Sequence, residues 1–183
     1  MAKYILLMAS KGGVGKSAIC KQLSRELHRL GNKVEAVDYD PQQHLARFAN
    51  LNNYMFVENG DYVVVDTQGA HTETNVKLLE AMREEDATII VPLRPTDDDY
   101  AEALRMRDRL EKFDLLDKSI FVINGAYRAN DKDVKNFSNL LSSTVKVSKA
   151  VFTQRKAFAK EPDHKVVSEI SKFLHSEILT KQK

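Results

Sequence analysis

The sequence contains a single cysteine, Cys20, in 183 residues. One thiol excludes an internal disulfide and any metal site built on a pair of cysteines of this chain, and we expect Cys20 to be a buried apolar side chain. No stretch approaches the roughly 18 apolar residues that a membrane-spanning helix needs. The first residues lack the small-residue cleavage site of a secretory signal. These absences predict a cytoplasmic protein without stable membrane association.

Internal repeats, low-complexity tracts and linker-like segments are also absent. Charged residues make up 30% of the sequence and hydrophobic residues 43%, as in soluble globular proteins. A chain of this length is expected to form one domain, over residues 1–183. No helix-turn-helix segment precedes the first apolar run, so repression of a specific operator is not expected.

Strand-like apolar runs alternate with amphipathic stretches along the chain, and the connections are short. This alternation predicts an α/β fold: a mostly parallel sheet with helices on both faces. The expected strands are 4–9, 34–38, 62–66, 88–91, 119–123 and 145–152, with an additional strand at 54–57. The expected helices are 17–30, 44–50, 72–84, 98–113, 131–141, 154–160 and 164–179.

Three of the seven glycines follow the first expected strand, in the segment Lys11-Gly12-Gly13-Val14-Gly15-Lys16-Ser17. Glycines between a strand and a helix let backbone N–H groups surround a polyphosphate at the positive end of the helix. Lys16 would reach the outer phosphates of ATP, and the Ser17 hydroxyl would bind Mg²⁺. The usual phosphate loop has glycine where Lys11 stands, and a second cation there would stabilise charge on the transferred phosphoryl group. The expected nucleotide contacts are Lys11, Gly12, Gly13, Val14, Gly15, Lys16, Ser17 and Ala18.

Two further strands end in acidic residues. Asp38 ends the strand 34–38 and Asp40 follows two residues later, at the edge where open α/β sheets bind ligands. Carboxylates there can serve Mg²⁺ and an attacking water. Asp66 ends the apolar strand 62–66, where it would reach the water shell of Mg²⁺, and Gly69 could offer its N–H to the γ-phosphate.

The loop Lys-Gly-Gly-x-Gly-Lys-Ser resembles the deviant phosphate loop of the ParA/MinD superfamily, and the likeness extends along nearly the whole chain. The segment 38–42 resembles the family's Asp-x-Asp-Pro-Gln motif, and 152–160 resembles the late Thr-Gln-Arg segment of small plasmid-partition ParA proteins of the ParF type. The resemblance implies ATP-dependent sandwich dimers in which Lys11 crosses to the partner's nucleotide. It also implies that Asp40 orients or activates water and that Asp38 supports the metal shell.

Two other segments resemble the family. Residues 91–98 correspond to the segment that packs near the nucleotide and the dimer seam. Asn124 stands where the family often reads adenine, although an asparagine before Gly125 is also typical of a turn. The interval between Asp40 and Asp66 is shorter than the family pattern, and Gln68 replaces a common proline or glycine.

Charge is unevenly distributed along the chain. Residues 1–117 contain 15 Lys/Arg and 20 Asp/Glu, whereas 118–183 contain 13 and 6. A basic C-terminal part fits a polyanion partner, and ordinary solvated lysines give the same pattern. The candidate DNA-binding residues are Arg128, Lys132, Lys135, Lys146, Lys149, Arg155, Lys156, Lys160 and Lys165.

The function that the resemblance implies is that of a ParA-type partition ATPase. ATP would close a homodimer that binds DNA without sequence preference on the nucleoid, and a ParB-like or other small adaptor would stimulate hydrolysis. One alternative is a MinD-like membrane-cycling ATPase, which would place the apolar stripe of helix 164–179 on lipid; packing of that stripe on the core is the simpler interpretation. Another is an ATPase that positions a protein cargo. Metal-cluster carriers of the superfamily need bridging cysteines, which Cys20 alone does not supply.

Overall fold

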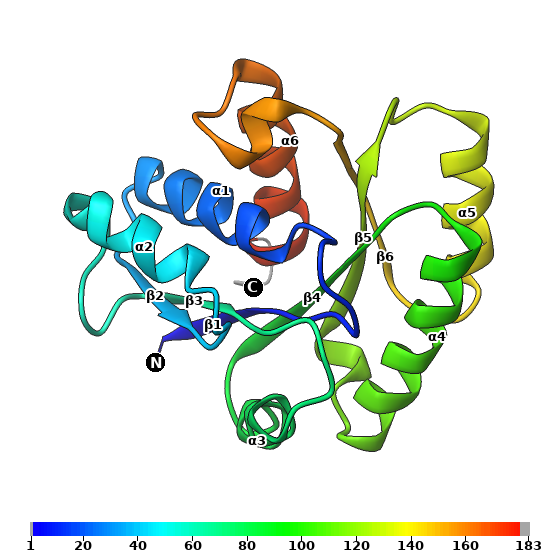
Figure 1. Ribbon diagram of the computed structural model, residues 1–183, viewed down its shortest axis with the longest axis horizontal. Coiled ribbons are helices and arrows are strands. Elements are labelled where there is room, and N and C mark those ends of the chain that lie inside the picture. Colours follow the sequence, from blue (N-terminus) through cyan, green and yellow to red (C-terminus); the bar gives the residue numbers. More distant parts are fainter. Residues whose placement is uncertain (1, 180–183) are drawn as a thin grey trace.

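A computed structural model describes residues 2–179, and its centre is a six-stranded sheet with the order β2-β3-β1-β4-β5-β6 (Figure 1). All five neighbouring pairs are parallel. The carboxyl ends of the strands therefore lie at one edge of the sheet. The strands are β1 (Lys3–Leu7), β2 (Val34–Asp38), β3 (Tyr62–Asp66), β4 (Ala87–Leu93), β5 (Ser119–Ala126) and β6 (Val147–Thr153).

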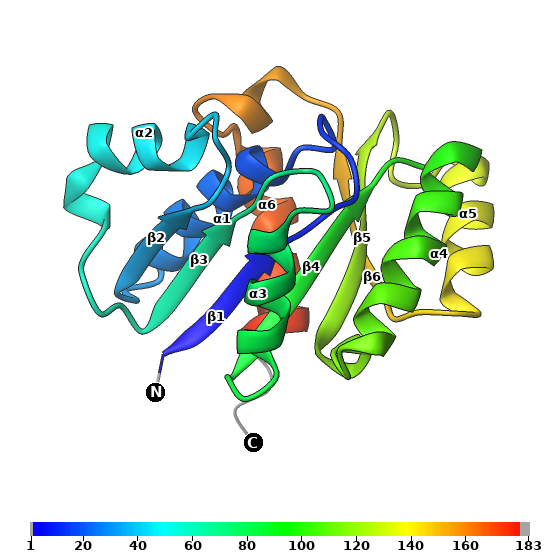
Figure 2. The same ribbon diagram turned by 60° about the horizontal axis from the view of Figure 1, so that its bottom comes forward.

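Helices cover both faces of the sheet, with α1, α2 and α6 on one side and α3, α4 and α5 on the other (Figures 1 and 2). A π-helical turn, Leu174–Ile178, continues the last α-helix, and 3₁₀ turns occupy Asn53–Met55, Leu116–Lys118 and Lys156–Ala159. The helices are α1 (Lys16–Arg29), α2 (His44–Leu51), α3 (Glu73–Met82), α4 (Asp97–Lys112), α5 (Lys132–Ser142) and α6 (His164–Phe173).

The central strand β1 is buried and apolar from Ile5 to Leu7, because these residues contribute to both hydrophobic layers. Ile5 and Leu7 pack with α1 and α6, whereas Leu6 packs with the layer that contains α3 and α4. A strand buried on both faces has no alternation of polar and apolar residues. This is why the sequence pattern indicates a parallel sheet.

The predicted α/β architecture is confirmed, and most element bounds agree within two or three residues. The additional strand at 54–57 is wrong. Asn53–Met55 forms a 3₁₀ turn, and Phe56 makes only an isolated bridge to Val34. The preceding asparagines favour a turn over an extended chain, and Tyr54 and Val57 remain exposed instead of alternating into a core.

The apolar stripe of the last predicted helix packs on the sheet. Val166, Ile170, Phe173, Leu174 and Ile178 are all buried in the layer with α1. Val167, the remaining apolar residue of the stripe, is half-buried. The stripe therefore packs mainly on the core, as the simpler interpretation has it. In the described part of the chain, no helix has the length and apolar character needed to cross a bilayer.

Candidate nucleotide site

The loop from β1 to α1 has the backbone of a phosphate cradle. Gly13 and Gly15 have φ angles of 76° and 90°, in the left-handed region that side chains other than glycine rarely adopt. Helix α1 begins directly afterwards at Lys16, with neither a side-chain cap nor an acidic residue in its first turn. Its first N–H groups therefore face the loop without a protein anion, which is the arrangement of an anion-binding helix terminus.

Asn124, at the end of β5, braces this loop. Its Nδ2 donates to the Val14 carbonyl oxygen at 2.7 Å. A Cβ atom on Gly15 would lie 2.4 Å from the same Nδ2, so glycine is needed for the close approach. The structure thus gives Asn124 a contact that its sequence position did not predict, and the reading of adenine stays a prediction.

Asp38 and Asp66 lie side by side because they end neighbouring strands in register. The Asp38 carboxylate accepts three backbone hydrogen bonds of 2.9 Å, from the N–H groups of Asp40, Leu45 and Ala46. These bonds hold the turn after β2 and the start of α2. Support of a metal shell by Asp38 stays a prediction, but its contacts show that it shapes the turn carrying Asp40.

Asp66 is fully buried, and neither of its carboxylate oxygens has a hydrogen-bond partner among residues 2–179. Burial raises its pKa to about 6; Asp38 and Asp40 add to the rise, while Ser17 and Lys16 oppose it. The nearby Ser17 hydroxyl lowers the pKa of Asp66, although it forms no hydrogen bond of ordinary geometry with the carboxylate.

The groups around Asp66 fit a bound Mg²⁺ and nucleotide. Lys16 is also buried, and burial lowers its pKa while Asp66 and Asp40 counter that change. An unpaired buried carboxylate beside a serine hydroxyl supplies the oxygen ligands that Mg²⁺ takes together with phosphates. Phosphates on the cradle would in turn receive the charge of Lys16.

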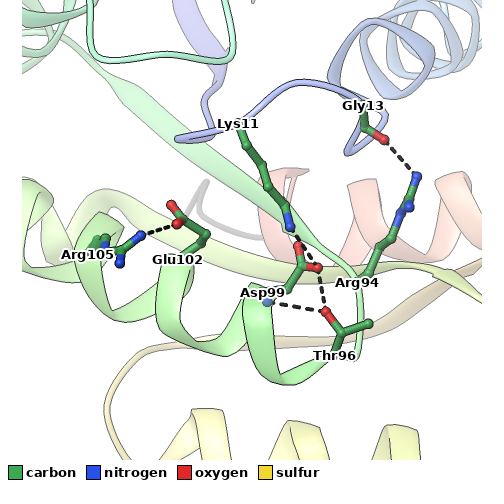
Figure 3. A network of polar contacts seen from close by, with 7 residues as sticks. All are labelled: Lys11, Gly13, Arg94, Thr96, Asp99, Glu102 and Arg105. Atoms are coloured by element: carbon green, nitrogen blue, oxygen red, sulfur yellow. Dashed lines mark hydrogen bonds and ion pairs between the residues drawn. The ribbon is translucent and has the colours of Figure 1, made fainter.

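Lys11 contacts its own chain in this structure (Figure 3). Its Nζ lies 3.1 Å from Asp99 Oδ2, and the buried Asp99 carboxylate also accepts from the Thr96 hydroxyl at 2.7 Å. On the other side of the loop, Arg94 Nη2 donates to the Gly13 carbonyl oxygen at 2.9 Å. The segment 94–99 therefore holds the phosphate loop at two points. The sequence placed residues 91–98 near the nucleotide but gave no sign of the Asp99 contact.

Gly69 lies against the same loop. A Cβ atom on Gly69 would stand 2.3 Å from the Lys11 carbonyl oxygen and 2.7 Å from the Gly12 nitrogen. The Thr67 hydroxyl donates to the Leu7 carbonyl oxygen at 2.7 Å and ties the segment to β1. The loop after β3 thus touches the phosphate loop, as a γ-phosphate contact by Gly69 would need.

A cavity of about 550 Å³ opens beside the phosphate loop, within the size range of small-molecule sites. Thr153, Gln154 and Arg155 line it, so the Thr-Gln-Arg segment borders this cavity. The lining comes from the phosphate loop and α1 (Gly13, Gly15, Ala18), from Arg94–Thr96, from 124–127, from Asp131, Asp133 and Val134, and from 153–155 with Phe158 and Ala159.

The candidate DNA-binding residues differ in their surroundings. Lys146 is paired with Glu177 at 3.0 Å, and Arg155 lies 3.9 Å from Glu169. The other candidates are exposed: Arg128, Lys132, Lys135, Lys149, Lys156, Lys160 and Lys165. DNA contact by any of them stays a prediction.

Comparison with known proteins agrees with this geometry. The family model described as "CobQ/CobB/MinD/ParA nucleotide binding domain" matches residues 5–166. A putative plasmid partition protein from Borrelia burgdorferi, solved with AMPPNP, has a TM-score of 0.72 at 15% identity over 96% of this chain and 98% of that one. The cell division protein MinD from Aquifex aeolicus has a TM-score of 0.65 at 16% identity over 97% and 98%. The pNOB8 ParA solved with nonspecific DNA has a TM-score of 0.63 at 12% identity over 97% and 100%. At these identities the solved structures establish the fold.

Proposed function

The chain belongs to the CobQ/CobB/MinD/ParA nucleotide-binding family, and on that premise we propose that it is a Mg²⁺-dependent, ParA-type partition ATPase. ATP closes a homodimer, the dimer binds DNA without sequence preference on the nucleoid, and a ParB-like or other small adaptor stimulates hydrolysis. Plasmid or other DNA is the cargo. The similar proteins include one solved with an ATP analogue and one solved with nonspecific DNA, which supports this choice within the family.

The orphaned carboxylate of Asp66 beside the glycine cradle is the observation that carries the proposal. Phosphates would lie on the first turn of α1, with Lys16 on the outer phosphates and Ser17 and Asp66 toward Mg²⁺. Bound Mg²⁺ neutralises charge on the phosphates and so assists phosphoryl transfer. Asp40, whose backbone N–H is fixed by Asp38 at 2.9 Å, orients the attacking water.

Lys11 acts across the dimer in this proposal. The Lys11 side chain is 40% exposed and its ammonium is paired with Asp99 of its own chain. When the subunits meet, the ammonium would leave Asp99 and pair with the γ-phosphate of the partner's nucleotide. A cation delivered to the γ-phosphate by the partner couples hydrolysis to dimerisation.

Complementation between two inactive variants tests the proposal. Lys11→Ala and Asp40→Ala should each hydrolyse ATP at least about 100-fold more slowly than the wild type, because one loses transition-state charge stabilisation and the other loses water orientation. Asp40→Ala alone should retain ATP and accumulate as a dimer in light scattering. The mixture should regain activity, because half of the sites in a heterodimer have both Lys11 and Asp40.

A mixture of Lys11→Ala with the double variant Lys11→Ala/Asp40→Ala is the matched control, since no heterodimer there restores a site. Heterodimers that form without regaining activity would contradict action across the interface. If Asp40→Ala stays monomeric with ATP, the role proposed for Asp40 is wrong.

DNA binding should show the salt dependence of phosphate contacts. If the dimer neutralises about four to six phosphates, the logarithm of its affinity should fall with the logarithm of salt concentration with a slope of roughly −4 to −5.

Replacing the exposed Lys132 and Lys135 of α5 by alanine should make this slope shallower by about two to four. Each lost phosphate contact removes about one unit of slope, and the two lysines occur in both subunits of the dimer. Fluorescence anisotropy with duplexes of two unrelated sequences measures both slopes. Lys77→Ala on α3, an exposed lysine paired with Glu73, is the control; an equal effect there would contradict the assignment of this face.

A further inference from the structure

Asn75 lies in the first turn of α3 and reaches back to the loop that follows β3. Its side-chain Nδ2 donates to the carbonyl oxygens of Gln68 and Ala70, at 2.9 and 2.8 Å. These two residues flank Gly69. Because both partners are carbonyl groups, only the NH₂ side of the amide can occupy this position. Asn75 is 1% exposed, so both bonds are shielded from water.

The Asn75 contacts fix a tight turn. The Ala70 N–H donates to the Gln68 carbonyl oxygen at 3.0 Å, which closes a three-residue turn around Gly69. The Thr72 hydroxyl accepts the Asn75 N–H at 3.1 Å and sets the start of α3. The same turn presses on the backbone of Lys11 and Gly12, and Figure 2 shows the loop before α3 passing beside the loop after β1. The phosphate loop on one side and Asn75 on the other therefore hold Gly69.

We propose that Asn75 is a positioning residue that sets the preference of this site for ATP over ADP. The inference rests on the proposed function and adds a residue to it. ATP and ADP share the groups that the cradle, Lys16 and the cavity would bind, and they differ in the γ-phosphate. A Gly69 N–H held in place before binding meets that phosphate without reorganisation, so the contact contributes its full strength to ATP affinity.

The remaining oxygen of Asn75 fits this role. Asn75 Oδ1 is buried and accepts no hydrogen bond from the described residues. Buried acceptors without a partner are rare in folded proteins. Among the described residues, the side-chain amide is therefore fixed only by its two Nδ2 hydrogen bonds to the turn.

Gln22 provides a matched control within the same protein. It is 3% exposed, and its Nε2 donates to the carbonyl oxygens of Phe158 and Lys160 at 2.9 and 3.1 Å. Gln22 is thus also a buried amide that holds a loop by two carbonyl groups. Its loop lies beside the cavity that would hold the nucleoside, a part that ATP and ADP have in common.

Calorimetric titration with Mg²⁺-AMPPNP and Mg²⁺-ADP separates a positioning role from a structural one. Asn75→Ala should weaken AMPPNP binding by at least about tenfold, the size of one lost hydrogen bond to a charged group, and ADP binding by less than about threefold. Gln22→Ala should change both affinities by the same factor. Hydrogen exchange should accelerate in residues 67–71 of Asn75→Ala and in residues 157–161 of Gln22→Ala.

The outcomes distinguish this inference from the proposed function. Equal weakening of AMPPNP and ADP in Asn75→Ala, or no weakening, would overturn the role of Asn75 while leaving a nucleotide-binding protein. Wild-type protein that binds neither nucleotide would overturn the proposed function itself. If Asn75→Ala does not fold, wild-type exchange gives the answer: AMPPNP should protect residues 67–71 more than ADP does, and equal protection would refute the inference.

Discussion

Asp66→Asn should raise the free energy of unfolding of the nucleotide-free protein at pH 7 by about 3 kcal/mol. The folded structure raises the pKa of Asp66 from 3.8 to about 6, and two pKa units correspond to about 3 kcal/mol. Asparagine has nearly the same shape as the neutral carboxyl group, so the substitution removes mainly the buried charge. For a chain of this size, the expected rise in melting temperature is roughly 6 to 12 °C.

The raised pKa of Asp66 determines how the stability of the folded protein changes with pH. Between pH 3.8 and about 6, the folded protein holds a proton on Asp66 that the unfolded chain has released. Stability from this group is therefore complete below pH 3.8 and falls as pH rises through about 6. The advantage of Asp66→Asn should be largest above pH 6 and should disappear near pH 4.

Urea denaturation of both proteins between pH 4 and 8 measures this difference. Asp61→Asn, at the exposed residue just before the same strand, is the control and should leave stability nearly unchanged. A gain in stability that does not vary with pH would show that the Asp66 charge is not its cause. Asp66→Asn should also lose the Mg²⁺-dependent part of its stabilisation by ATP. The buried negative charge that destabilises the nucleotide-free protein is the charge that would bind Mg²⁺.

Lys16→Ala should weaken ATP binding by about 100-fold or more and abolish nucleotide-dependent dimerisation. A charge-assisted contact to phosphate is worth up to about 3 kcal/mol, which is a factor of roughly 100. The loss should exceed that of an exposed lysine, because Lys16 is 5% exposed and close to Asp66 and Asp40. Without it, the negative charges of Asp66 and Asp40 would face the phosphates with no buried lysine between them.

Calorimetry with Mg²⁺-ATP and light scattering test this expectation together. Lys21→Ala is the control, because Lys21 lies further along α1, 5.9 Å from the Phe48 ring centroid, and does not line the cavity. Equal ATP affinity in Lys16→Ala and the wild type would be incompatible with a phosphate cradle at residues 11–17.

The sequence predicted those parts of the site that depend on neighbouring residues. Gly13 and Gly15 of the phosphate loop have left-handed backbone angles, and the position of these glycines between a strand and a helix is visible in the sequence. Asp38 and Asp66 could be placed together because both end apolar runs, and parallel strands end at a common edge.

Contacts between residues far apart in the sequence were not predictable in the same way. Lys11 pairs with Asp99, and Asn124 donates to Val14, across 88 and 110 positions respectively. No periodicity encodes such pairs, because they depend on how loops from different strands meet. The capping role of Asp38 was not predicted for the same reason. Acidic residues at strand ends predict metal ligands, whereas the Asp38 carboxylate accepts hydrogen bonds from three backbone N–H groups.

The position of β1 at the centre of the sheet has a consequence for how the protein folds. Leu7 pairs with Asp66 on one side and with Ile90 on the other, so the strand that leads into the phosphate loop emerges from the ribosome long before either partner. Parallel pairing across such sequence distances is slow, and an apolar strand without partners is prone to aggregate. Residues 3–7 should therefore stay unpaired while the chain is being synthesised, and nucleotide binding is not expected before β5, which carries Asn124, has been made.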